Sequence, residues 1–181
     1  MKKNIFFSAI FLITVLAVTG IIAITITTSE NSHEFIIPDQ QNDSIKSLSL
    51  YFANNEADQM VLEKRKVKVG NRIEEVIVEE LIKGPNSSEL YPTFPKGAEL
   101  YGVEVIEGIA FVNFKESLLS LHWGGASREI MTICSLVFSL TEIEYIESVQ
   151  ILIESERVET LAGSFDIHEP LKSEDVKTYL R

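Results

Sequence analysis

The chain has 181 residues, of which 45% are hydrophobic and 24% are charged, a composition that supports one globular core and excludes disorder for the bulk of the molecule. Its formal net charge at pH 7 is −11, and Lys2 and Lys3 are the only charged residues before Glu30, so the rest of the chain carries −13. A surface of that sign repels phosphate backbones, which argues against nucleic acid as a partner.

The first predicted element is a membrane anchor at residues 5–28, preceded by a short cytoplasmic start at residues 1–4. The anchor contains no charged residue, and its twenty-four residues at about 1.5 Å each would cross a hydrocarbon core of roughly 30 Å. It is also longer than the apolar region of a cleaved signal peptide. The lysines before it and the acidic residues after it predict a single-pass protein in the cell membrane, with a cytoplasmic N-terminus and its domain on the extracytoplasmic side.

Three further parts are expected after the anchor: a tether at residues 29–44, a domain at residues 45–170 and a C-terminal tail at residues 171–181. The tether is mostly polar, and no cysteine follows the apolar run, so a lipid anchor is not expected. The stretch from Asp166 to Arg181, which includes this tail, is acidic with few core residues, and it either lies against the domain or remains mobile.

Two strands open the predicted domain. Leu48, Leu50 and Phe52 alternate with polar residues, as in a half-buried strand, and a second strand is predicted at residues 60–69. The second strand carries a basic cluster that consists of Lys64, Arg65, Lys66 and Lys68. These charges suit an edge strand, where they discourage pairing with another chain. The alternative is that they contact an acidic partner surface.

A helix is predicted from Asn71 to Lys83. Asn71 followed three residues later by Glu74 is typical of a capping box, and Gly84 and Pro85 provide the end of the helix. Apolar residues at helical spacing form one stripe, namely Ile73, Val76, Ile77 and Leu81.

A tight hairpin is predicted around a two-residue turn at Glu107-Gly108. The pairs expected across it are Val105–Ala110, Val103–Val112 and Tyr101–Phe114. This register places all six of these side chains on one sheet face, and a slip of one residue would destroy the match.

A second helix is predicted at residues 128–141, and it contains no charge from Ile130 to Leu140. Its core stripe consists of Ile130, Ile133, Cys134, Val137 and Phe138. The opposite side carries Thr132, Ser135 and Ser139. Two explanations stay open: the tail or the tether folds over this side, or it meets another protein, because exposed uncharged surface is uncommon on a strongly charged domain.

A strand at residues 146–154 follows, and Glu156 and Arg157 are expected to turn the chain into a short segment at residues 158–161. The order of elements predicts an α+β fold, with two helices packed on one face of a mainly antiparallel or mixed sheet in a split β-α-β arrangement. Such a fold leaves the other face of the sheet open to solvent or to a partner.

Residues suited to catalysis or metal binding are few, and none falls in a known motif. His33, His122 and His168 lack metal-ligand spacing, and Cys134, the single cysteine, lies on an apolar stripe where a thiol is inert. Adjacent acids such as Glu79-Glu80 point in different directions from a helix and indicate a solvated face. We therefore expect no catalytic residue, no cofactor and no metal site, and hence no enzyme.

Several spaced segments resemble, in order, the GerMN family of sporulation and spore germination domains. They are LYFANNEAD (50–58), EKRKV (63–67), EELIKGP (79–85), FPKGAEL (94–100), VIEGIAFVNF (105–114) and SLTEIEYIESVQILIE (139–154). The resemblance covers residues 47–170, which is nearly all of the part after the tether.

This resemblance implies an extracytoplasmic domain of Gram-positive, often spore-forming, bacteria, with a non-enzymatic part in envelope assembly during sporulation or germination. It also implies a ring-building-like architecture, as in domains that assemble through helix and sheet faces of neighbouring copies. The chain departs from the best-known member type, because it has one copy of the domain where that type has two, and a predicted transmembrane helix where that type has a lipid-modified cysteine.

The combined prediction is a membrane-anchored scaffold or assembly protein of the bacterial envelope. It would act by protein–protein interaction, either with other envelope or sporulation proteins or with itself. The first candidate face consists of Thr132, Ser135 and Ser139, and the second of Lys64, Arg65, Lys66 and Lys68. The alternative function is binding or remodelling of peptidoglycan, for which the candidate aromatic residues are Tyr91, Tyr101 and Trp123.

Overall fold

The structure is a computed structural model, and it describes residues 44–70 and 72–180. The strands are β1 (Ser44–Ala53), β2 (Met60–Val69), β3 (Leu100–Ile106), β4 (Ile109–Phe114), β5 (Ser148–Ile153) and β6 (Glu156–Arg157), and the helices are α2 (Ile73–Lys83), α3 (Ser117–Ser120), α4 (Ala126–Thr141) and α5 (Ser173–Lys177). The predicted anchor at residues 5–28 lies outside the described residues. Within the described ranges, no helix combines the length and the apolar character needed to cross a bilayer.

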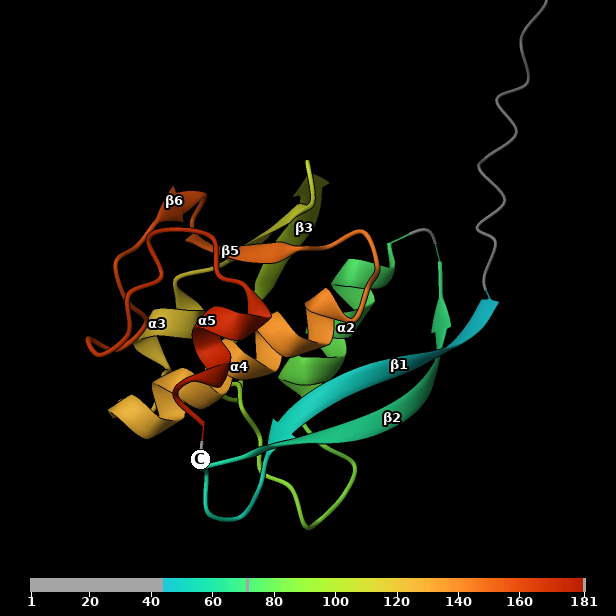
Figure 1. Ribbon diagram of the computed structural model, residues 1–181, viewed down its shortest axis with the longest axis horizontal. Helices are drawn as coiled ribbons and strands as arrows, with labels where there is room; N and C mark the ends of the chain where they lie inside the picture. The colour runs from blue at the N-terminus through green and yellow to red at the C-terminus, as the bar shows by residue number, and fades with distance from the viewer. Residues whose placement is uncertain (1–43, 71, 181) are drawn as a thin grey trace, which may run out of the picture. The chain divides into compact units, whose positions relative to one another are not determined.

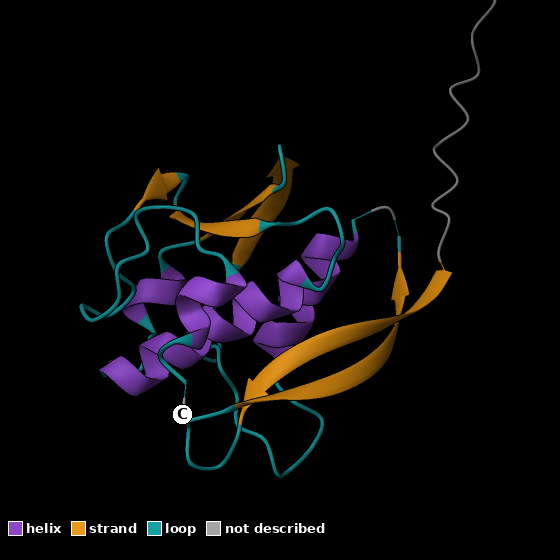
Figure 2. Cartoon of the chain, viewed as in Figure 1, coloured by secondary structure: helices purple, strands orange, loops and turns teal. Residues whose placement is uncertain are grey.

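The strands divide between two sheets. β1 and β2 form an antiparallel hairpin, while β3, β4, β5 and β6 form a second sheet in that order. In the second sheet β4 and β5 run parallel and the other neighbours run antiparallel. Helices α2 and α4 lie in a layer between the hairpin and the second sheet (Figures 1 and 2). The predicted α+β class with mainly antiparallel, mixed pairing is confirmed.

Helix α4 is the centre of this arrangement, because it contacts β1, β5, α2 and α5. Every residue from Ile130 to Val137 is buried. A helix that is covered on several sides needs apolar or small residues nearly all round, which accounts for its uncharged sequence. The hydroxyl-bearing side of α4 is covered by β1 and the loop that carries Thr93, which neither of the two explanations above named, while α5 of the C-terminal segment contacts α4 at Cys134.

The first hairpin follows its predicted alternation. Leu48, Leu50 and Phe52 are at most 2% exposed and face the helices. Because the side chains of a strand alternate between faces, the other face of this hairpin is turned away from the core.

The second hairpin has the predicted turn. Glu107 and Gly108 have φ angles of 49° and 79°, and positive values at both positions define the type I′ turn that fits the twist of paired strands. Two of the predicted pairs are observed, Val105–Ala110 and Val103–Val112.

The third predicted pair is wrong. Leu100, and not Tyr101, pairs with Phe114, because the register shifts between Leu100 and Gly102. Tyr101 lies at this irregularity and is 55% exposed. A bulge of one residue re-aims a side chain from one face to the other, which regular alternation cannot anticipate.

The turn after β5 also differs from the prediction. Glu154 and Ser155, with φ angles of 50° and 69°, make the turn. Glu156 and Arg157 then form β6 and pair back onto β5, so residues 158–161 are not a strand. Since β5 ends at Ile153, the two residues directly after it are the ones that can close a two-residue hairpin.

Helix α2 starts at Ile73 with Arg72 in the N-cap position, and the predicted capping residue Asn71 lies outside the described residues. Its predicted end is confirmed, since Lys83 is its last residue and Gly84 follows with a φ angle of 87°. Glu79 is exposed, whereas Glu80 is buried, so the prediction that both belong to a solvated face is wrong for Glu80.

The C-terminal segment packs against the domain. Leu171 pairs with Val149 of β5, and Val176 of α5 is fully buried. Helix α5 contacts α4. The described residues from 171 to 180 therefore contribute to the same core as the predicted domain.

Candidate functional site

The hydroxyl side chains of α4 do not form an exposed face. Thr132, Ser135 and Ser139 are each at most 1% exposed, because β1 and the loop that carries Thr93 cover them. The prediction that this side is an exposed protein-binding surface is therefore wrong.

Each hydroxyl instead joins α4 to the chain that covers it. Ser139 Oγ accepts a hydrogen bond from the backbone N–H of Tyr51 at 2.9 Å, and Ser135 Oγ donates to the Tyr51 carbonyl at 2.6 Å. The Thr93 hydroxyl donates to Ser135 Oγ at 2.7 Å. Small polar residues on this side of α4 thus satisfy backbone groups of β1 that would otherwise be buried without partners.

Arg65 of the predicted basic cluster is a structural residue. Its side chain is 8% exposed, with Nη1 2.7 Å from Glu80 Oε2 and Nη2 2.5 Å from Glu63 Oε1. Nη2 also donates to the Gly84 carbonyl at 2.9 Å. Because this network joins β2 to the end of α2, Arg65 is not available to a partner.

The lysines of the cluster lie on the opposite face of β2. Lys64, Lys66 and Lys68 are all exposed, and we call them the basic face. The register sets Ser49, Ser47 and Ile45 of β1 opposite them. Ile45 is 76% exposed. The outer side of the hairpin thus combines three cations with small or apolar neighbours.

The electrostatics of the Arg65 network favour ionised carboxylates. Burial alone would raise the pKa of Glu80, but hydrogen bonds from Arg65 and Lys83 outweigh burial and hold this pKa below its ordinary value of 4.5. Burial likewise opposes ionisation of Glu63, and its bonds from Arg65 and from backbone N–H groups lower its pKa overall.

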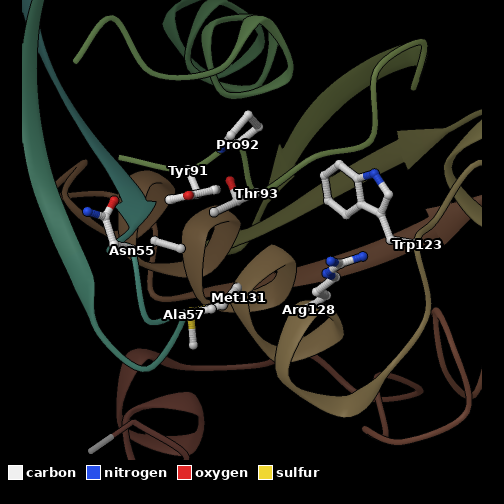
Figure 3. Close-up of a pocket in the computed structure, with 9 residues that line it drawn as sticks. Asn55, Ala57, Tyr91, Pro92, Thr93, Trp123, Arg128 and Met131 are labelled. Atoms are coloured by element: carbon white, nitrogen blue, oxygen red, sulfur yellow. The ribbon is translucent and has the colours of Figure 1, made fainter. Parts of the chain in front are cut away.

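A second candidate site is a cavity of about 440 Å³, which we call the aromatic pocket. It is lined by Ala53, Asn55, Ala57, Tyr91, Pro92, Thr93, Trp123, Arg128 and Met131. Figure 3 shows Tyr91 and Trp123 on opposite sides of the pocket, with Arg128 beside Trp123. Tyr91 is 55% exposed and Trp123 is 43% exposed. The guanidinium carbon of Arg128 lies 5.9 Å from the centre of a Trp123 ring, within the range of a cation–π contact.

Local sequence explains how these side chains meet. Gly124 and Gly125, with φ angles of 71° and 86°, turn the chain into α4 directly after Trp123, a backbone conformation that glycine adopts without strain. Arg128 and Met131 are three residues apart in α4 and so share one helix face. The backbone N–H of Tyr91 donates to the Ala53 carbonyl at 2.9 Å, which holds the opposite wall against β1.

A hydrogen-bonded chain fixes the two walls relative to each other. His122 Nδ1 accepts from the Gly124 backbone N–H at 3.2 Å, and its Nε2 lies 3.2 Å from Thr132 Oγ1. Thr132 Oγ1 donates to the Thr93 carbonyl at 2.5 Å. Burial lowers the pKa of His122 below its ordinary value of 6.5, which favours the neutral ring that this chain requires.

The structure brings together only part of the predicted aromatic set. Tyr91 and Trp123 line one pocket, whereas Tyr101 lies apart on β3, with its hydroxyl donating to Glu154 at 2.9 Å. Arg128 and Met131 were not predicted as site residues. The sequence signal that points to them is their three-residue spacing at the start of a predicted helix, shortly after a tryptophan and two glycines.

The remaining candidates have structural positions. Cys134 is fully buried, its thiol donates to the Val176 carbonyl at 3.7 Å, and burial raises its pKa to about 12. His168 is exposed, and His33 lies outside the described residues. In the ranges that the structure describes, no group of three or more His, Cys, Asp or Glu residues is placed to hold a metal ion.

Comparison with known families gives a match over most of this domain. The family model Germane, described as sporulation and spore germination, matches residues 49–159. No protein of curated function matches the chain.

Similar solved structures have the same fold. A protein from Clostridium perfringens, provisionally described as a lipoprotein, is 25% identical with a TM-score of 0.53, and the match covers 77% of this chain and 93% of that one. The first GerMN domain of the sporulation protein GerM from Bacillus subtilis is 17% identical with a TM-score of 0.63, over 72% of this chain and 99% of that one. The tandem GerMN domains of the same protein are 16% identical with a TM-score of 0.64, over 73% of this chain and 48% of that one, so this chain spans about half of the tandem protein.

Proposed function

The chain belongs to the Germane family of sporulation and spore germination domains, and from this premise we propose that it is a non-enzymatic assembly protein of the bacterial envelope. In this proposal residues 5–28 form a single span in the cell membrane and the domain lies on the extracytoplasmic side. The likeness to the Clostridium perfringens protein described as a lipoprotein supports attachment to a membrane.

The observation that carries the proposal is the basic face on the outer side of the first hairpin. Lys64, Lys66 and Lys68 are exposed there, while Arg65 between them is taken up by the core. The chain as a whole carries a net charge of −11, so these cations stand out against an acidic background. Opposite charges across an interface steer encounter and fix orientation.

The partner that fits this face is an acidic protein surface. It belongs either to another envelope or sporulation protein or to a second copy of this acidic chain. Ile45, which pairs with Lys68, adds apolar area beside the cations. An exposed apolar side chain among charges suits the partly apolar contact area of protein interfaces.

The absence of catalysis in this proposal is supported by the state of the most reactive side chains. The pKa of Cys134 is raised to about 12 by burial, so its thiol is protonated at neutral pH. Both ring nitrogens of His122 are engaged, one by the Gly124 N–H and one by Thr132. These groups hold the fold together.

The test uses the full-length protein in detergent micelles and in cells of the native host. We expect the double variant Lys64→Glu, Lys66→Glu to lose its cross-linked complexes and its self-association at low salt, whereas Lys96→Glu, Lys177→Glu keeps both with the same change in net charge. Normal cross-linking and normal sporulation and germination in the first variant would contradict the proposal.

Peptidoglycan binding is the second candidate function, and the aromatic pocket favours it because Tyr91 and Trp123 are both exposed there. Sedimentation of the full-length protein with purified peptidoglycan tests it directly. Retention that is lost in Trp123→Ala and kept in Tyr101→Ala would establish wall binding at this pocket. Equal retention of both variants, or none of the wild type, would contradict it.

A further inference from the structure

The aromatic pocket is separate from the basic face, and its side chains have a distinctive chemistry. Most of its lining is apolar, with two exposed aromatic residues, Tyr91 and Trp123, and a flexible thioether, Met131. A single cation, Arg128, stands at its edge. Trp, Tyr, Arg and Met are the residues enriched where proteins bind proteins, and the first three dominate binding hot spots.

We propose that the aromatic pocket binds an extended segment of a protein partner that presents a large apolar side chain next to a carboxylate. The apolar side chain enters between Tyr91 and Trp123, and the carboxylate pairs with Arg128. This inference rests on the proposed function, since it assigns an anchoring site to the same binding protein.

The size of the pocket fits such an anchor. Its volume of about 440 Å³ lies in the range of roughly 300–1,000 Å³ that is usual for ligand sites, and it exceeds what one aromatic side chain needs. A neighbouring residue of the bound segment is therefore accommodated as well.

The charge of Arg128 supports an anionic ligand. No described residue forms an ion pair with its guanidinium, which contacts the Trp123 ring. The adjacent carboxylate of Glu129 is turned to the other side, where it accepts backbone N–H groups of Leu161, Ala162 and Ser164 at 2.9–3.0 Å. A guanidinium left open in this way offers two parallel N–H donors to a carboxylate.

Charge distinguishes a peptide from a sugar chain as the ligand of this pocket. The Thr93 hydroxyl donates to Ser135, and the Thr93 carbonyl accepts from Thr132. The Asn55 and Arg128 side chains, the Tyr91 hydroxyl and the Trp123 indole N–H remain as polar lining groups without a hydrogen bond to a described residue. Among these lining groups Arg128 carries the charge, and a guanidinium bonds a carboxylate more strongly than a neutral hydroxyl, so the lining favours a carboxylate-bearing peptide over a neutral sugar chain.

The walls are set before the ligand arrives. The chain of hydrogen bonds from Gly124 through His122 and Thr132 to Thr93 links the Trp123 wall to the Tyr91 wall. A site that is already ordered spends less binding free energy on immobilising its side chains.

The chain provides its own probe, because Trp123 is its one tryptophan. The experiment titrates full-length protein in detergent micelles with short blocked peptides that contain Phe-Asp, Phe-Asn or Ala-Asp, and separately with N-acetylglucosamine oligomers, while the tryptophan emission is recorded. We expect saturable quenching or a shift with the Phe-Asp peptide, and binding at least about tenfold weaker for the other two peptides, which corresponds to about 1.4 kcal/mol.

Two variants sharpen the result. Arg128→Gln should weaken binding of the Phe-Asp peptide about tenfold and leave binding of the Phe-Asn peptide unchanged. Lys96→Gln should change the binding of neither peptide. Urea unfolding of Arg128→Gln should match the wild type, because this side chain is at the surface of the pocket. Equal loss of both Phe peptides in Arg128→Gln, or a response to the sugar oligomers and to no peptide, overturns the inference.

The peptide titration and the charge-reversal test of the basic face have independent outcomes. If the reversal of Lys64 and Lys66 abolishes the cross-linked complexes while the peptides give no response, the assembly role stands and the pocket inference is wrong. If the Phe-Asp peptide binds with the expected Arg128 dependence while charge reversal changes nothing, the pocket is correct and the basic face is not the interface.

Discussion

At the scale of single residues, two charged side chains, Arg65 and Glu129, are buried in the core and hold neighbouring segments in place. Arg65 lies within a run of cations, yet it binds Glu63 and Glu80 and the Gly84 carbonyl in the core. Removing one partner of a buried ion pair leaves the others uncompensated, which costs more than the pair itself contributes.

Arg65→Met should therefore lower the free energy of unfolding by about 3 to 5 kcal/mol. The reason is that Glu63 would lose its cation and Glu80 would keep only the exposed Lys83, while both stay largely covered. Urea unfolding followed by circular dichroism gives the value. Lys64→Met, one residue away on the exposed face, is the matched control and should change stability by less than about 0.5 kcal/mol; comparable losses in both variants would contradict this account.

Glu129 is the second such residue. It is fully buried in the first turn of α4, and its carboxylate accepts the backbone N–H groups of Leu161, Ala162 and Ser164. It therefore shapes the loop between β6 and the C-terminal segment. A buried carboxylate with three N–H donors is a stable arrangement, since hydrogen bonds to a charge are stronger than neutral ones.

Glu129→Gln keeps the shape of the side chain but brings an NH₂ group towards backbone N–H donors. We therefore expect the free energy of unfolding to fall by about 2 to 3 kcal/mol. We also expect faster amide exchange at Leu161, Ala162 and Ser164. Hydrogen-exchange mass spectrometry shows which amides exchange faster, and urea unfolding measures the loss of stability. Glu144→Gln, at an exposed position, should leave both unchanged. Uniformly faster exchange across the protein would contradict a local role for Glu129.

At the scale of elements, α4 shows why hydroxyls on a helix need not mark an interface. β1 lies across these hydroxyl side chains, and the Tyr51 backbone forms hydrogen bonds with both Ser135 and Ser139. Helix and hairpin are thereby locked in register as well as packed.

Ser139→Ala should destabilise the protein by about 1 to 3 kcal/mol, because the Tyr51 N–H loses its partner in a buried place. Ser139→Glu should prevent folding, since it buries an unpaired carboxylate against β1. Ser88→Ala is the exposed control and should be neutral. Thermal unfolding orders the three variants, and a stable, folded Ser139→Glu protein would show that this side of α4 is open after all.

At the scale of the whole molecule, the Arg65 network predicts how stability depends on pH. The pKa values of Glu63 and Glu80 are lower in the folded protein than the ordinary value of 4.5. The unfolded chain therefore binds their protons first on acidification. Their contribution is fully present above pH 4.5 and is lost as pH falls through the lower folded-state values.

We expect the stability difference between the wild type and Arg65→Met to be largest above pH 5.5 and to narrow as the pH falls from 4.5 to 3. Without the guanidinium, burial is opposed only by Lys83 at Glu80 and by backbone N–H groups at Glu63, so both pKa values are higher than in the wild type and protonation relieves the variant. Urea unfolding of both proteins over this pH range measures the difference. Parallel pH profiles would mean that Arg65 does not set the ionisation of the two acids.

The sequence by itself determined the local features of this protein, because each depends on neighbouring residues. Alternation in β1, the end of α2 at Gly84 and the type I′ turn at Glu107-Gly108 follow from periodicity and from which residues tolerate a given backbone conformation. The fold class was predicted from the order of these local elements and from the spaced family segments, which are themselves local sequence patterns.

Only the tertiary structure decided which of these surfaces are open. Thr132, Ser135 and Ser139 are buried because β1 packs across α4. Arg65 is buried because α2 places Glu80 beside it. Tyr91 and Trp123 met across a pocket although more than thirty residues separate them in the chain. Burial and proximity of this kind depend on how elements pack at long range, and periodicity within one element contains no information about what will cover it.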